Sequence, residues 1–440
     1  MHKGYPYYKP RFWEADVIGV EDLEKYRVGG YCPIALQSTL CNGRYKVLHK
    51  LGSGGSSTQW LARDLQDGVL VAVKVLAAER QETVNNELFM AERLGSLPTD
   101  TPALQHLRLP LSTFLEMSPN GEHTCLVQPL MGPSLNQMLR RGGWREGTFR
   151  VRAQLVPVLA QQAAEVLRLL HGMRIALHDI TLSNWAFALS ESVRTWTEEE
   201  VYYVLGRPKV APVMTVDGSE PGPHAPAEVV APADMSGPAM ASFLKESIVC
   251  IDVGDAVQLD EGPLQRQPTV PIHYRAPEAM LESQLSLASD IWSFAMLIFN
   301  ILSGQPLIEP FLSSEQDVLR QMEILLATPP SSLRSRFINH SAVPYPVEIL
   351  PAEAARYTAN WAELERRLRC VGTRDEPKAS VVVDRLPILA RLHTRLTEED
   401  VQTWKTLLSK MLTCTPDERP DIGMVCAWLE KHGGRATFAY

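Results

Sequence analysis

Residues 45–76 read YKVLHKLGSGGSSTQWLARDLQDGVLVAVKVL, and this stretch decides the fold. It contains three runs rich in apolar and β-branched residues, a composition typical of β-strands. A cluster of glycines separates the first two runs, and Asp67-Gly68 separates the last two. An Asp-Gly pair between two such runs favours a tight hairpin turn. The stretch therefore predicts neighbouring β-strands with a glycine-rich turn among them.

Downstream of this stretch the pattern changes from strand-like to helical. Residues 81–95 predict a helix that ends at Gly95, and a strand pair follows around the turn Pro119-Asn120-Gly121. Beyond residue 132, apolar residues at spacings of three and four indicate a core-facing helix, and further helices follow. The predicted helices cover residues 155–170, 286–303, 314–327 and 398–412. We therefore expect an α+β fold with a β-rich front and a helical body.

These patterns divide the chain into segments. We expect an extended leader at 1–44, a β-rich unit at 45–131 and a helical unit at 132–440, which carries an insertion at about 190–246. The start of the insertion, 190–205, has a helix-like pattern, and we expect its apolar residues to dock on the larger, helical unit. Residues 206–238 carry seven prolines and predict an irregular segment without helices, mobile or extended over the surface. The alternative is a wholly disordered spacer.

Composition and charge exclude several classes of protein. The chain has 440 residues, and its 27 glycines and 32 prolines are too few for a collagen or a low-complexity chain. A net charge of −8 argues against direct binding to nucleic acid, because domains that bind nucleic acid are usually basic. We therefore expect a globular protein with no nucleic-acid partner.

Cysteine usage and apolar stretches bear on the compartment. The seven cysteines form no C-x-x-C pair, which argues against a zinc site or a disulfide framework and favours a reducing compartment. The N-terminus lacks the apolar core of a signal peptide, and the most apolar stretch, 291–302, is too short to span a bilayer. We therefore expect a protein of the cytoplasm, the nucleus or both, without a membrane partner. We also expect a monomer.

The glycine cluster and the strand behind it form the first candidate site. In residues 51–58, LGSGGSST, the glycines let backbone N–H groups approach a phosphate, because no Cβ intervenes. The alternative is an ordinary flexible turn. Lys74 lies inside an apolar strand, where an ammonium needs an anionic partner unless it reaches solvent at a sheet edge. Together the two features favour a lysine that binds nucleotide phosphates. Glu87 in the next helix is its natural ion-pair partner, and Glu82 and Glu92 are less favoured alternatives.

Two further motifs carry carboxylates, and each is also compatible with a simple turn. In residues 177–184, LHDITLSN, Asp179 and Asn184 lie five residues apart, a spacing that suits a base that orients a hydroxyl and a magnesium ligand. Asp252 follows an apolar strand, and its carboxylate can bridge magnesium to phosphates. Three motifs follow in order at residues 274–278 (YRAPE), 289–293 (SDIWS) and 416–420 (PDERP), and Arg419 is expected to pair with Glu278.

In this order, the motifs make the chain resemble the eukaryotic protein kinases. Other motifs make it similar, more narrowly, to the SR-protein kinases and their fungal relatives. The short motifs are EDLEKY at 21–26, GGY at 29–31, NGRY at 42–45, NG at 120–121 with His123, CLV at 125–127 and GPSL at 132–135. In addition, Ser57-Thr58 stands where most kinases have a third glycine, and a long insertion separates Asn184 from Asp252. The resemblance covers about residues 21–432.

The resemblance implies a bilobal protein-kinase fold with a β-rich N-lobe and a helical C-lobe. It also implies an ATP-dependent serine/threonine protein kinase that uses Mg²⁺ and acts on a protein substrate, with arginine-serine-rich chains as the candidate class. Asp179 is then the catalytic base, Lys74 with Glu87 clamps the phosphates, and Asn184 and Asp252 hold Mg²⁺. The residues implied to bind the nucleotide are Leu51, Gly52, Ser53, Gly54, Gly55, Ser57, Gln59, Ala72, Lys74, Pro129, Met131 and Ala186.

The chain departs from the family pattern at several positions. Thr181 stands where a lysine is expected two residues after Asp179, and losing such a cation lowers a rate by roughly 10²–10³-fold, by analogy with an oxyanion-hole donor. Gln59, Gln128 and Ala186 replace a valine, a large gatekeeper and a leucine, which predicts weak nucleotide affinity. The alternatives are a pseudokinase that acts as a binding or scaffold module, and a small-molecule kinase of the aminoglycoside type, against which the downstream motifs argue.

Overall fold

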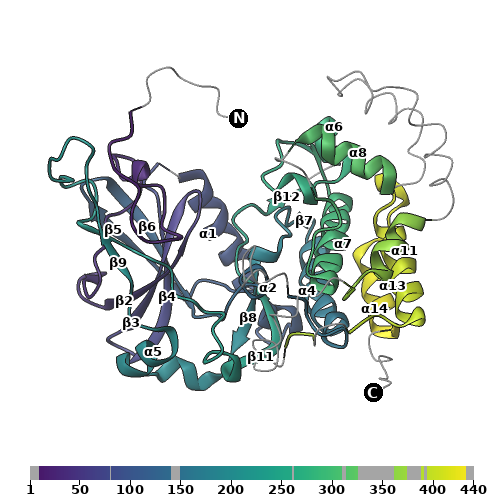
Figure 1. The fold of residues 1–440 in the computed structure, drawn as a ribbon, viewed down its shortest axis with the longest axis horizontal. Helices are drawn as coiled ribbons and strands as arrows, with labels where there is room; N and C mark the ends of the chain where they lie inside the picture. Colours follow the sequence, from purple (N-terminus) through teal and green to yellow (C-terminus); the bar gives the residue numbers. More distant parts are fainter. Residues whose placement is uncertain are drawn as a thin grey trace. The chain divides into compact units, whose positions relative to one another are not determined.

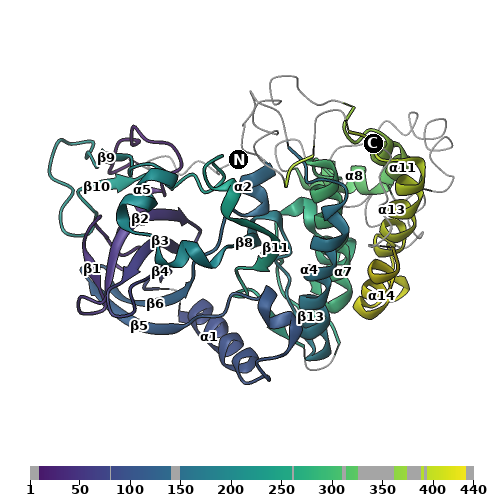
Figure 2. The same cartoon turned by 90° about the horizontal axis from the view of Figure 1, so that it is seen from below.

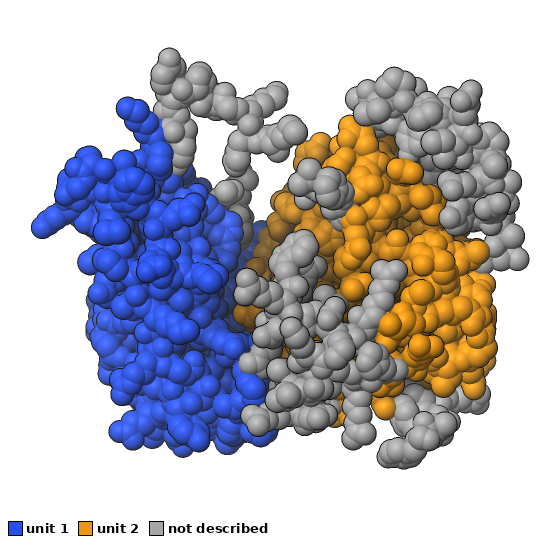
Figure 3. Space-filling model, in the orientation of Figure 1, with its two compact units in different colours: residues 1–97, 108–132, 189–244 blue, residues 98–107, 133–188, 245–440 orange. Residues whose placement is uncertain are grey.

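The computed structural model describes residues 9–79, 81–139, 149–259, 262–309, 314–325, 361–373, 388–390 and 394–432. The chain forms two compact units, which Figure 3 shows in different colours. Unit 1 comprises residues 1–97, 108–132 and 189–244, and unit 2 comprises residues 98–107, 133–188 and 245–440. The insertion, which we expected within the helical unit, therefore belongs to unit 1.

Unit 1 is built on a six-stranded antiparallel sheet with the strand order β1-β2-β3-β4-β6-β5 (Figure 2). The strands are β1 Thr39–Leu40, β2 Tyr45–Ser53, β3 Ser57–Asp64, β4 Val69–Leu76, β5 Ser112–Ser118 and β6 Gly121–Pro129. The predicted hairpin at Asp67-Gly68 joins β3 to β4, and Gly68 there has φ of +69°, a value that glycine adopts without strain. The predicted turn at 119–121 joins β5 to β6.

The two faces of the sheet bury different side chains. On one face, Val71, Val73 and Val75 alternate along β4 and pack with Trp60, all at most 2% exposed. On the other face, the helix α1, Gln81–Gly95, packs Leu88 against Leu76 and Leu126. The bounds of this helix agree with those predicted from the sequence. The second face is the one that also carries Lys74, because side chains alternate along a strand.

The leader is a folded part of unit 1. Residues 9–44 contain a 3-10 helix, Leu23–Lys25, and β1. Tyr26 and Tyr31 are at most 2% exposed and pack, together with Phe12, against apolar residues of the insertion. The irregular leader is therefore anchored by its aromatic side chains rather than by regular secondary structure.

The start of the insertion packs on the sheet of unit 1, and the prediction that it docks on the helical unit was wrong. It forms a 3-10 helix, Glu191–Thr195, and the helix α5, Glu198–Leu205, whose first turn is capped by Thr197. Trp196 and Val201 bury against Leu48, Leu61 and Leu70 of the sheet. The apolar pattern of the segment predicted a docked helix correctly, but it could not indicate which apolar surface would cover it.

The proline-rich part of the insertion is also folded. Residues 206–238, which the structure describes throughout, contain no helix, as predicted. They include a hairpin of β9, Val210–Pro212, and β10, Glu228–Val230. Its buried side chains join the aromatic residues of the leader in one apolar cluster. The expectations of a mobile segment and of a disordered spacer were therefore wrong, because leader and hairpin bury each other's apolar side chains.

Unit 2 is helical. Its helices are α2 Leu135–Leu139, α4 Leu155–Gly172, α6 Pro277–Glu282, α7 Leu287–Ser303, α8 Glu315–Leu325, α11 Ala362–Arg369, α13 Glu398–Met411 and α14 Ile422–His432. The helix α7 is buried along nearly its whole length and packs beside α4 and α13, an arrangement visible in Figures 1 and 2. None of the helices in the described ranges is long and apolar enough to span a membrane.

Short elements connect the helices of unit 2. Three two-stranded pairs are β7 Ile175–Ala176 with β12 Val257–Gln258, β8 Trp185–Leu189 with β11 Leu244–Cys250, and β13 Leu264–Gln265 with β14 Gln284–Leu285. Short 3-10 helices cover Pro102–His106, Leu182–Asn184, Ile272–Tyr274 and Pro416–Glu418, and a fifth, Ala241–Phe243, lies in the insertion. The predicted site residues of this unit lie in and between these short elements.

Candidate active site

Lys74 and Glu87 form the predicted ion pair. Lys74 extends from β4 and Glu87 from α1, and Nζ of Lys74 lies 2.8 Å from Oε2 of Glu87. The side chains are only 4% and 2% exposed. A buried charge of this kind requires its partner, because either side chain alone would leave an uncompensated charge in a medium of low dielectric constant. Both members of the pair lie within unit 1.

The glycine loop joins β2 to β3. Its turn is closed by a hydrogen bond of 2.9 Å from the Gly54 N–H to the Ser57 carbonyl oxygen. A Cβ atom placed on Gly52 or Gly55 would meet no atom within 4 Å, and one on Gly54 would be 3.9 Å from the Ser57 hydroxyl. Packing in this structure does not require these glycines. The space around them leaves the loop backbone open to close approach by a ligand, and the predicted contact with phosphate stays a prediction.

The register of the sheet gathers the predicted nucleotide-binding residues of unit 1 on one face. Gln59 on β3 lies opposite Lys74, and Ala72, two residues before Lys74, lies opposite Gln128 on β6. Gln128 is 1% exposed, and its carboxamide oxygen has no hydrogen-bond partner within the described part of the chain. The predicted amides at 59 and 128 therefore line the same face as the lysine.

The remaining predicted nucleotide-binding residues are placed as follows. Leu51, Gly52 and Ser53 end β2, and Ser57 begins β3. Pro129 ends β6, with Met131 two residues beyond it. Ala186 lies on β8 of unit 2 and is 1% exposed. Their roles stay predictions.

Asp179 and Asn184 lie together in unit 2. The side-chain amide of Asn184 donates to Oδ2 of Asp179 over 2.5 Å and to the Asp179 carbonyl oxygen over 3.0 Å. Burial raises the pKa of Asp179 to about 6, helped by the nearby carboxylates of Asp255 and Asp252, although the Asn184 bond opposes the shift. In its ionised form the carboxylate can accept a hydrogen bond from a hydroxyl and act as a base toward it.

Asn184 and Asp252 lie on adjacent segments of backbone. The Ile251 N–H donates to the Asn184 carbonyl oxygen over 2.9 Å, and the Gly254 N–H donates to Oδ1 of Asp252 over 2.9 Å. Carboxylate and amide oxygens are ligands that Mg²⁺ accepts. Across the described ranges, no three His, Cys, Asp or Glu side chains form a metal cage. Asn184 and Asp252 carry ligand types that suit Mg²⁺, and their assignment as its ligands stays a prediction.

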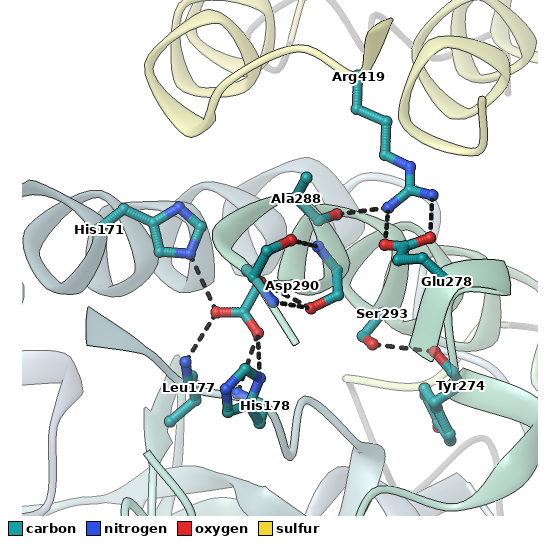
Figure 4. A network of polar contacts seen from close by, with 11 residues as sticks. His171, Leu177, His178, Tyr274, Glu278, Ala288, Asp290, Ser293 and Arg419 are labelled. Atoms are coloured by element: carbon teal, nitrogen blue, oxygen red, sulfur yellow. Dashed lines mark hydrogen bonds and ion pairs between the residues drawn. The ribbon is translucent and has the colours of Figure 1, made fainter. Parts of the chain in front are cut away.

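Asp290 of α7 contacts the loop at Leu177 and His178, as Figure 4 shows. Asp179 is the next residue of this loop. Its carboxylate accepts hydrogen bonds from the N–H groups of Leu177 (2.7 Å) and His178 (2.9 Å) and contacts Nε2 of His171 at 3.0 Å. Although burial opposes ionisation, the bond to His171 and the charge interaction with His178 hold the pKa of Asp290 below its usual range. The sequence motif marked Asp290, but its partners more than 110 residues away were not predictable.

The loop backbone is strained at His178. This residue has φ of +63°, which is uncommon for a residue other than glycine. Its imidazole is buried, and burial lowers its pKa. The anchoring by Asp290 gives a physical reason for the strained conformation to persist, since two successive N–H groups converge on one carboxylate.

Arg419 pairs with Glu278, as predicted. Both contacts of this bidentate pair measure 2.7 Å, and Arg419 also donates to the Ala288 carbonyl oxygen over 2.8 Å (Figure 4). The guanidinium lies over the ring of Trp292, 5.2 Å from its centre. The pair fastens the start of α6 to the segment before α14.

The amino-acid sequence is similar to those of known protein kinases. A model of the protein kinase domain matches residues 241–428, which is less than half of the chain. Protein kinase dsk1 of Schizosaccharomyces pombe is 24% identical over 71% of this chain and 71% of its own length. The serine/threonine-protein kinase SRPK of Physarum polycephalum is 24% identical over 68% of this chain and 69% of its own length. The chain has a protein-kinase fold and resembles the SR-protein kinases.

Two further comparisons define the extent of this likeness. SRSF protein kinase 3 of Mus musculus is 32% identical over 127 residues, which cover 28% of this chain and 22% of that protein. The crystal structure of the PF14_0431 kinase domain matches 91% of this chain and 98% of its own, with a TM-score of 0.56 at 16% identity. The structural match establishes the kinase fold, and the sequence matches establish the likeness to SR-protein kinases.

Thr181, which stands where the family resemblance implies a lysine, is buried. Thr181 is 6% exposed and precedes the 3-10 helix that ends at Asn184. The threonine side chain contributes no charge at this position. The chain therefore has no side-chain charge at the position where the family resemblance implies a lysine.

Proposed function

We propose that this chain transfers the terminal phosphoryl group of ATP to a serine or threonine hydroxyl of a protein. The formed ion pair of Lys74 and Glu87 carries this proposal. Burying two charges costs desolvation energy, and apolar residues of similar volume serve folding equally well. A buried pair on the face that lies behind a glycine loop therefore supports a role in binding an anionic ligand.

Each residue has a role that follows from its chemistry. Lys74 binds the phosphates, and Glu87 holds its ammonium in place. Asp179 accepts a hydrogen bond from the substrate hydroxyl and orients it, while Asn184 fixes one oxygen of the carboxylate. Asn184 and Asp252 hold Mg²⁺, which neutralises phosphate charge when bound.

The proposed substrate is a basic protein of the arginine-serine type. The relatives include a kinase whose name refers to SRSF proteins. The chain itself has a net charge of −8, and a basic substrate would be attracted to it by long-range electrostatics. Both observations support an arginine-rich substrate over an acidic one.

Transfer of labelled phosphate from ATP into an arginine-serine peptide tests the proposal. We expect incorporation with the wild-type chain, none with the same peptide carrying alanine for serine, and none with Asp179→Ala. Asp417→Ala, which removes an exposed carboxylate of unit 2, is the matched control and should keep full activity. Unchanged incorporation by Asp179→Ala would refute the assignment of the base.

The second candidate is a pseudokinase that binds a partner without catalysis. The specific observation in its favour is Thr181, because the missing cation lowers the expected rate by roughly 10²–10³-fold. This function predicts nucleotide binding without any Asp179-dependent incorporation of phosphate. The same assay, combined with nucleotide titration, therefore separates the two candidates.

A further inference from the structure

The leader places a lysine at the tip of the glycine loop. Nζ of Lys25 donates to the carbonyl oxygen of Gly55 and to the hydroxyl of Tyr31, each over 3.1 Å. The Tyr31 hydroxyl in turn donates to the carbonyl oxygen of Gly54. Leader and loop are thus joined at two successive carbonyl groups, all within unit 1.

Lys25 differs from the other cations around it in its partners. Arg27 lies 3.1 Å from Glu79, Lys74 pairs with Glu87, and Lys50 pairs with Glu21. The Lys25 ammonium, by contrast, is held by two neutral oxygens, and no carboxylate of the described residues lies within ion-pair distance of it. It is therefore a positive charge without a counter-ion beside a loop suited to phosphate.

The position of Lys25 is fixed by the turn that follows it. The Tyr31 N–H donates to the Lys25 carbonyl oxygen over 2.9 Å, and the Asn120 side chain donates to the Tyr31 carbonyl oxygen over 2.6 Å. A Cβ on Gly30 would lie 1.8 Å from the Lys25 carbonyl oxygen, so this close turn requires glycine. Tyr31 itself is 2% exposed. The placement of the lysine is therefore built into the fold of the leader.

The carbonyl groups of the loop tip would otherwise oppose phosphate binding. A carbonyl oxygen carries partial negative charge and repels an anion, whereas backbone N–H groups attract it. Tyr31 and Lys25 occupy the carbonyls of Gly54 and Gly55, and the lysine adds a full positive charge. Lys74 is already balanced by Glu87, so the site gains from a further cation.

We propose that Lys25 belongs to the phosphate-binding site, as a cation that the leader delivers to the glycine loop. This inference rests on the proposed function, because it presumes a nucleotide at the loop. The lysine acts on the phosphates through its charge, and it partly replaces the charge that Thr181 does not supply. Tyr31 is a positioning residue that holds both Lys25 and the loop carbonyl.

Nucleotide titration of Lys25→Met in the full chain tests the inference. Methionine keeps most of the apolar length of the side chain and removes the charge. We expect the dissociation constant of ATP to rise about tenfold, as for the loss of one charge-assisted contact, with a smaller rise for ADP and none for adenosine. The loss should shrink at high salt, because ions screen the charge. Lys25→Arg should restore most of the ATP affinity.

Lys46→Met is the matched control. Lys46 is another half-buried lysine of unit 1, but it pairs with Glu198 at 2.9 Å. Its variant should leave all three affinities unchanged. Unchanged ATP binding by Lys25→Met would overturn the inference, as would an equal loss for ATP and adenosine, which indicates a structural role alone. If the wild-type chain binds no nucleotide at all, the proposed function fails together with the inference.

Discussion

The side-chain amide of Asn184 donates a hydrogen bond of 2.5 Å to Oδ2 of Asp179, and Oδ1 of the same carboxylate is buried without a partner in the described residues. One oxygen is thus fixed, and the other is left to accept a further hydrogen bond. Since Asp179 also has a raised pKa, its ionisation couples the stability of the fold, and the proposed phosphate transfer, to pH.

Phosphate transfer should decrease as the pH falls through about 6. Burial raises the pKa of Asp179 to about 6, and only the ionised carboxylate can act as a base toward the substrate hydroxyl. The rate of transfer at saturating ATP and peptide, measured between pH 5 and 8, checks this. A rate that stays level down to pH 5 would contradict the assignment of Asp179 as the base.

Asp179→Asn should stabilise the fold at neutral pH. The folded-state pKa lies above the ordinary value of 3.8, so above pH 6 the folded chain must hold a buried charge that the asparagine avoids. As the pH falls from 6 toward 4, the wild-type carboxyl takes up a proton and the difference should vanish. Melting temperatures at pH 7.5 and pH 5, with Asp417→Asn as the exposed control, check the sign. A larger gain at pH 5 than at pH 7.5 would disprove the argument.

Asp290→Ala should destabilise unit 2 by about 3–5 kcal/mol, the usual effect of breaking a buried charged network. The substitution leaves the N–H groups of Leu177 and His178 without their acceptor. Chemical denaturation measures the loss, and Asp417→Ala serves as the control. A loss below that of the control would mean that the loop is held by other contacts.

Trp196→Ala should destabilise unit 1 and so lower the melting temperature. Trp196 is 7% exposed and packs edge-on against Phe243, with ring centres 4.7 Å apart, so its removal costs about 3–5 kcal/mol. Tyr203→Ala on the same segment is the control, because Tyr203 is 87% exposed. Deleting residues 207–238 should also lower the melting temperature, since the hairpin covers the leader. Equal, small effects of Trp196→Ala and Tyr203→Ala would refute the packing of this segment.

Gln128→Leu should stabilise the fold and tighten nucleotide binding. It removes a buried carboxamide oxygen that has no partner in the described chain, and an unsatisfied acceptor of this kind costs about 1–3 kcal/mol. Gln59→Val should likewise tighten ATP binding by restoring apolar contact on the same face. Thermal melting and ATP titration check both, with Gln66→Leu on an exposed turn as the control. A fall in stability for Gln128→Leu would show that the amide has a favourable partner.

The apolar cluster of leader and insertion shows where prediction from sequence stops. The pattern of residues 190–205 indicates a helix with an apolar side, because spacing along the chain determines which side chains share a face. It does not indicate which surface covers that side. Trp196 meets Leu61 and Leu70 across more than 120 residues of chain, and such a contact depends on shape and on the competing surfaces of the whole fold.

Sequence by itself determined the elements and the chemistry of the candidate site. The Asp67-Gly68 hairpin, the helix at 81–95 and the pairing of Lys74 with Glu87 follow from local spacing and from the need of a buried ammonium for an anion. Tertiary structure alone decided that Asp290 anchors the loop at His178 and that Lys25 reaches the glycine loop. Lys25 and Gly55 are 30 positions apart in the sequence, and His178 and Asp290 are 112 positions apart. Such contacts arise only when distant segments of the chain pack together.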